Sequence, residues 1–213
     1  MAHIDWTRAV PLGSFSPVSS ELGSQRSWLR VGGAGGIVGT ACYLLLIVLP
    51  APTNAQVALT YGFALGFALL ALAVGDLVRG VAPRLAAVGV VGGVLGAGSV
   101  LSMILVQLAA KARPGDVGQV VAVWLGLDVV WDLYIGTSLL VFAAGMWLRG
   151  GAWRIAGAVG VPLAIAFLFI NVWTFPVPPG EAGLIDLGPF AAFWYLGVAI
   201  AILWSSRGAA AGS

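Results

Sequence analysis

Six long runs of apolar residues follow one another along the chain, separated by short breakers that contain Pro, Gly or charged residues. A bilayer's hydrocarbon core is about 30 Å thick, so a helix that crosses it needs about 20 mainly apolar residues. We therefore predict an all-α fold: a polytopic membrane bundle of six transmembrane helices. The predicted spans are Val31–Pro50, Gln56–Ala73, Leu85–Ala109, Val117–Leu148, Trp153–Trp173 and Leu187–Trp204.

The apolar runs also predict the domain organisation. Residues 31–205 form one transmembrane domain of six helices. Residues 1–30, which are rich in Ser and Gly, precede it as an N-terminal arm, and residues 206–213 follow it as a short tail. With an even number of spans, the arm and the tail lie on the same side of the membrane.

Basic residues predict which side that is, because loops that stay in the cytoplasm carry an excess of Lys and Arg. If the N-terminus is inside, only Lys111 and Arg113 fall outside. We therefore expect both termini to be cytoplasmic. The arginines that then fall on the inner side are Arg8, Arg26, Arg30, Arg79, Arg84, Arg149, Arg154 and Arg207.

Composition supports the membrane class and excludes several kinds of site. Only 8% of the residues are charged, against about 25% in soluble domains. The single cysteine, Cys42, and the single histidine, His3, exclude an internal disulfide, a Cys- or His-based metal cage and a haem held by two histidines. The sequence also has no phosphate-binding loop and no paired nucleophile and base. We expect no metal, no resident cofactor and no nucleic-acid partner.

Glycines recur at a spacing of four residues within the first three spans. Such spacing lets helix backbones approach closely in a membrane. It has two interpretations: packing inside the bundle, or a face for another membrane subunit. Three glycine-rich helices also indicate a tightly packed half, with more space beside helices four to six. The pairs are Gly32 and Gly36, Gly62 and Gly66, and Gly89 and Gly93.

Two aspartates, Asp128 and Asp132, interrupt the fourth apolar run. Residues four apart share one face of a helix, and a carboxylate in hydrocarbon is costly unless it is paired, protonated or in contact with water. We interpret the pair as the centre of an outward-facing acidic and aromatic pocket around Asp132. The plainer alternative is a solvated Asp128 at the interface, with Asp132 in a polar contact between helices.

Other polar and aromatic residues reach a similar depth when residues are counted from the arginine at the inner end of each span. At about 1.5 Å per residue, Asp132 lies roughly 25 Å from that end. Hydroxyl and amide groups can donate to a carboxylate, and aromatic faces attract cations. The remaining candidate ligand-binding residues are Trp131, Tyr61, Ser102, Asn171, Trp173, Trp194 and Tyr195.

Three segments carry a resemblance to known proteins: Leu127–Gly136, Asn171–Pro176, and Gly188-Pro189 continuing to Trp194-Tyr195-Leu196. In these segments the chain resembles uncharacterised small six-helix membrane proteins of bacteria. The resemblance implies a six-span fold in the bacterial inner membrane and no particular activity. Trp131-Asp132 is also similar to a dipeptide of membrane-embedded terpene cyclases, from which no residue role is carried over.

Three functions remain open from the sequence. The first is a non-catalytic subunit or helper of a larger inner-membrane assembly. The second is a small carrier or receptor for a cationic or amphipathic ligand, held by the acids and the tryptophans. The third is a membrane-embedded enzyme acting on a lipid or isoprenoid, with Asp132 as general acid and Asp128 tuning it.

Overall fold

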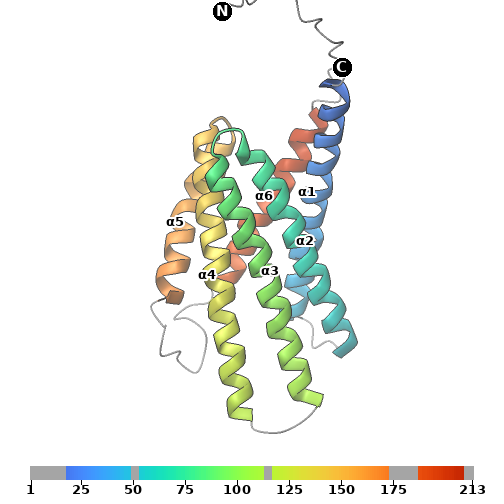
Figure 1. The fold of residues 1–213 in the computed structure, drawn as a ribbon, viewed down its shortest axis with the longest axis vertical. Helices are drawn as coiled ribbons and strands as arrows, with labels where there is room; N and C mark the ends of the chain where they lie inside the picture. Colours follow the sequence, from blue (N-terminus) through green and yellow to red (C-terminus); the bar gives the residue numbers. More distant parts are fainter. Residues whose placement is uncertain (1–17, 49–52, 113–116, 173–186, 209–213) are drawn as a thin grey trace, which may run out of the picture.

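The chain folds into a bundle of six helices, shown in Figure 1 from a computed structural model. The structure describes residues 18–48, 53–112, 117–172 and 187–208, and no strand occurs among them. All six helices are long and apolar enough to cross a membrane, which confirms the predicted fold class. The helices are α1 Val18–Val48, α2 Thr53–Arg79, α3 Pro83–Ala112, α4 Val117–Arg149, α5 Trp153–Val172 and α6 Gly188–Gly208.

The helix ends differ most from the apolar runs at two places. α1 begins at Val18, so part of the predicted arm is helical. α2 continues to Arg79 rather than ending at Ala73, because polar residues outside the apolar run still belong to the helix. There Arg79 pairs with Asp76 at 3.2 Å, one turn apart. The hydrophobic pattern therefore marks the part of a helix that lipid covers, not the whole helix.

The arrangement in Figure 1 places the first and last helices side by side. α1 packs against α2 and α6, and α4 packs against α3 and α5, whereas α5 and α6 make few contacts with each other. The turns from α2 to α3 and from α4 to α5 lie at one end, with the start of α1 and the end of α6. We call this the arginine end, because Arg79, Arg84, Arg149 and Arg154 flank its turns. The opposite end is called the distal end.

Polar contacts tie neighbouring helices together. Near the middle of the bundle the buried Ser138 hydroxyl of α4 donates to the Gly89 carbonyl of α3 at 2.8 Å. At the arginine end, the guanidinium of Arg149 donates to the Leu77 carbonyl of α2 at 2.6 Å. Arg30 of α1 donates to the Ser206 carbonyl of α6 at 2.8 Å. Each bond joins a side chain of one helix to a backbone carbonyl of another.

The six glycines for which the sequence allowed either internal packing or a face for another subunit lie at contacts between helices of the bundle. A Cβ on Gly36 would lie 2.9 Å from the Cβ of Ala199 on α6, and one on Gly66 would lie 2.8 Å from the Cα of Gly39 on α1. Gly32, Gly62, Gly89 and Gly93 likewise face side chains of neighbouring helices. The spacing is therefore accounted for by packing inside the bundle.

The six helices differ in length, and α1 has 31 residues and α2 has 27. α4 has 33 residues and α3 has 30, which correspond to about 50 Å and 45 Å. α5 has 20 residues and α6 has 21, or about 30 Å each. Because a short turn joins α4 to α5 at the arginine end, the extra length of α3 and α4 appears at the distal end. Figure 1 shows this hairpin projecting beyond the other helices.

Candidate functional site

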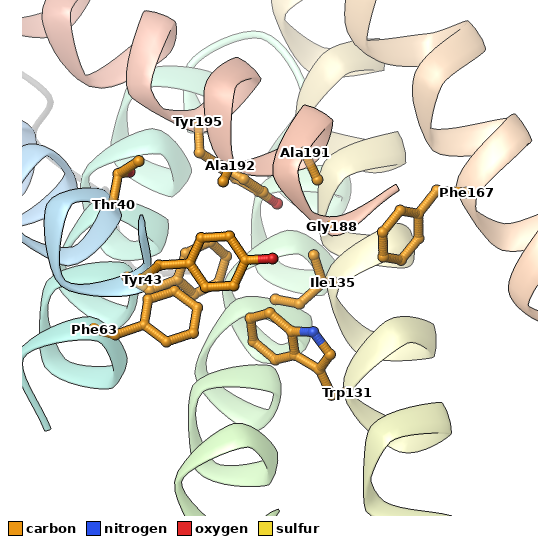
Figure 2. Close-up of a pocket in the computed structure, with 11 residues that line it drawn as sticks. Thr40, Tyr43, Phe63, Trp131, Ile135, Phe167, Gly188, Ala191, Ala192 and Tyr195 are labelled. Atoms are coloured by element: carbon orange, nitrogen blue, oxygen red, sulfur yellow. The ribbon is translucent and has the colours of Figure 1, made fainter. Parts of the chain in front are cut away.

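A small pocket lies in the distal half of the bundle, where five helices converge (Figure 2). Its cavity volume is about 20 Å³, enough for one water molecule. Most of the lining is aromatic or aliphatic. The lining residues are Thr40 and Tyr43 of α1, Phe63 and Phe67 of α2, Trp131 and Ile135 of α4, Phe167 of α5, and Gly188, Ala191, Ala192 and Tyr195 of α6.

Aromatic rings pack edge to face around this pocket. The ring centroids of Phe63 and Trp131 are 5.4 Å apart with planes at 73°. Those of Phe67 and Tyr195 are 4.7 Å apart at 82°. This geometry directs the positive edge of one ring at the negative face of another. The contacts hold α2 against α4 and α6 and give the pocket rigid walls.

Tyr195 brings a polar group to these walls. Its side chain is only 2% exposed, and its hydroxyl has no hydrogen-bond partner among the described residues. Ser138 approaches it without meeting hydrogen-bond geometry, and donates instead to Gly89. In Figure 2 the hydroxyls of Tyr43 and Tyr195 point toward the same space. A buried hydroxyl without a partner costs about 1–3 kcal/mol, so its position next to a cavity is informative.

The two aspartates lie on the same helix as Trp131, outside this lining. Asp128 and Asp132 are both half-buried on α4. Asp132 follows Trp131 directly, and because consecutive residues of a helix point about 100° apart, the two side chains leave α4 on different sides. Neither aspartate is among the described residues that line the pocket. The role predicted for Asp132 stays a prediction.

The other predicted site residues are dispersed. Tyr61 is 54% exposed on α2, and Ser102 is exposed on α3, where its hydroxyl donates to the Gly98 carbonyl at 2.9 Å. Equal depth along different helices therefore does not bring these two side chains to one site. Trp194 is buried, and its indole nitrogen donates to the Ala156 carbonyl of α5 at 2.9 Å.

Two predicted residues cannot be placed at the site. Asn171 belongs to the last turn of α5, but its side chain lies outside the described residues. Trp173 and the proline-rich segment after it also lie outside them. The structure thus brings together Trp131 and Tyr195 from the predicted set.

Sequence reasoning missed most of the pocket. Phe63 and Phe67 stand four residues apart on α2, a spacing that places two rings on one helix face, and this signal was available. Tyr43 and Phe167 carried no comparable signal, because a lone aromatic residue in an apolar span is common. Their convergence depends on how α1 and α5 pack.

These features define a six-helix polytopic membrane protein with a small aromatic pocket. Comparison of the chain with known protein families, with curated proteins and with solved structures found no match. Among the described residues, no group of three His, Cys, Asp or Glu side chains is placed to hold a metal ion. A function has therefore to be argued from the geometry of the bundle itself.

Proposed function

We propose that this protein is a non-catalytic subunit or helper of a larger membrane assembly, and that it meets its partner through the distal part of the α3–α4 hairpin. The observation that carries the proposal is the length of these two helices. To fit within a hydrocarbon core of about 30 Å, a helix of about 50 Å has to tilt by roughly 53°. Observed tilts range up to about 40°. The distal turns of α3 and α4 therefore extend beyond the hydrocarbon.

The side chains on this projecting part are apolar and exposed. Leu105 of α3 is 42% exposed, and Val121 and Val123 of α4 are 45% and 53% exposed. Counted from the arginine end, all three lie farther along their helices than α5 reaches along its own, about 30 Å. Apolar side chains that project past the bilayer gain free energy when another protein covers them. This supports a partner with an apolar surface at the distal face.

The test is the mass of the protein after gentle solubilisation from its native membrane. We expect a discrete complex heavier than the chain's 21.7 kDa. Val123→Lys, which places a charge on the projecting surface, should release the chain from that complex. A monodisperse monomer from the wild-type membrane contradicts the proposal.

Val81→Lys is the matched control. Val81 is also an exposed valine, but it lies in the turn between α2 and α3 at the arginine end. It introduces the same charge at the opposite end of the molecule, so we expect the complex to survive. Equal release by both variants would show that the charge acts through stability or solubility and not through the proposed surface.

A second candidate function is favoured by Tyr195. Its buried hydroxyl faces an aromatic pocket, which suits a small carrier or receptor for a cationic or amphipathic ligand. In this structure the cavity has room for one water molecule, so a larger ligand requires the helices to separate. The weak contact between α5 and α6 favours that side for an opening.

We place the protein in the bacterial inner membrane with both termini in the cytoplasm, on the basis of the arginine distribution and of the resemblance described above. The enzymatic alternative needs Asp132 to face a space that admits a lipid or isoprenoid. Since Asp132 is outside the lining of the described pocket, the geometry gives this alternative no support.

A further inference from the structure

A groove between α4 and α5 faces outward near the arginine end. It is lined by Ala144, Trp147 and Leu148 of α4 and by Ala158, Val161 and Pro162 of α5, and its volume is about 570 Å³. That volume falls within the range of about 300–1,000 Å³ that is typical of small-molecule sites. The groove is distinct from the aromatic pocket in the distal half.

The sequence explains why a hollow forms here. α5 lies directly against α4 at Gly157, where an added Cβ would stand 2.7 Å from the backbone nitrogen of Trp147. On α5 the lining beside this contact consists of the compact side chains of Ala158, Val161 and Pro162. On α4 it includes Trp147, which is half-exposed. Close backbones flanked by small side chains leave an open channel along the helix pair.

A positive charge lies at one end of the groove. Arg154, Ala158 and Val161 follow one another at four and three residues, so they share one face of α5. The Nε atom of Arg154 lies 3.9 Å from the place of a Cβ on Gly150, which puts the guanidinium beside the turn between α4 and α5. The positive end of the α5 dipole lies at the same turn, whereas the guanidinium of Arg149 is directed to the Leu77 carbonyl of α2.

We propose that this groove binds an anionic phospholipid from the membrane leaflet at the arginine end. One acyl chain lies along Ala158, Val161 and Pro162, and the phosphate accepts hydrogen bonds from the guanidinium of Arg154. Charge decides the class of lipid, because basic residues between helices at the interface attract anionic headgroups. At this end Asp76 is already paired with Arg79. The proposal is independent of any partner at the distal hairpin.

The test is native mass spectrometry of the purified full chain, titrated with dioleoyl phosphatidylglycerol and with dioleoyl phosphatidylcholine. We expect phosphatidylglycerol to bind more tightly to the wild type. Arg154→Gln should weaken phosphatidylglycerol binding about fivefold, the effect of one basic residue near a membrane surface, and leave phosphatidylcholine binding unchanged. Ala158→Phe, which fills the groove, should weaken the binding of both lipids.

Arg84→Gln is the matched control, because Arg84 is also an exposed arginine in the first turn of a helix at the arginine end. It should leave phosphatidylglycerol binding unchanged. An equal loss in both arginine variants, or no loss in Arg154→Gln, overturns the proposal. Elution volume and circular dichroism check that each variant folds. If Ala158→Phe does not fold, equal wild-type affinities for the two lipids overturn the proposal on their own.

Discussion

The hydroxyl of Tyr195 is the polar group whose position in the bundle is hardest to account for by packing alone. Its ring has a clear structural role, since it packs edge to face against Phe67 at 4.7 Å. Phenylalanine would fill that role without burying an oxygen. The hydroxyl is therefore explained either by a water molecule or by a ligand atom in the adjoining cavity.

Tyr195→Phe separates an occupied cavity from an empty one. If the hydroxyl is hydrogen-bonded to a molecule in the cavity, we expect the variant to lose about 1 kcal/mol of unfolding free energy. Thermal unfolding in detergent, followed by tryptophan fluorescence, measures the change. Tyr61→Phe, at a 54% exposed tyrosine, should leave stability unchanged. A Tyr195→Phe variant more stable than the wild type would mean that the hydroxyl has no partner at all.

At the scale of the helices, close backbone approach organises the bundle. Gly66 of α2 lies against Gly35 and Gly39 of α1, so at this point the two helices touch through backbone atoms. α3 approaches α4 in a similar way: a Cβ added to Gly92 would lie 2.9 Å from the carbonyl oxygen of Tyr134. In lipid, such dispersion contacts replace the hydrophobic effect as the main source of helix association.

Gly66→Ala tests this contact with a single added carbon atom. We expect it to destabilise the bundle by about 1–3 kcal/mol, because backbone atoms of α1 cannot move aside as a flexible side chain can. Gly98→Ala is the control, since no atom lies within 4 Å of its added Cβ. Thermal unfolding of both variants decides the matter. Equal stability would contradict the close contact between α1 and α2.

Across the whole molecule, the number and order of helices could be predicted from the sequence, because each apolar run is long enough to cross the hydrocarbon core as one helix. The internal role of Gly32, Gly62 and Gly89 was one of two interpretations that the pattern allowed. The aromatic pocket could be predicted only in part. Trp131 and Tyr195 were predicted correctly as individual residues of the pocket. Depth along a helix, however, does not show how the helix is rotated about its axis, and this rotation places Tyr61 and Ser102 on exposed faces.

The orientation of the whole bundle is tested by cysteine labelling. In a Cys42→Ala background, Gly80→Cys introduces a thiol in the turn between α2 and α3, and Gln119→Cys introduces one near the distal start of α4. We expect a membrane-impermeant maleimide, applied to intact cells, to label Gln119→Cys alone, and to label both thiols once the cells are opened. Labelling of Gly80→Cys in intact cells would reverse the proposed topology.

The pairing of α1 with α6 has a consequence for synthesis in the cell. α1 enters the membrane early, yet the surface formed by Gly33 and Gly36 meets Ala199 and Leu203 only after the last helix has been made. Until then that surface is open to lipid, to other nascent chains and to the membrane's quality-control proteases. The Arg30–Ser206 bond can form only at this last step, so it marks the moment at which the chain completes its assembly.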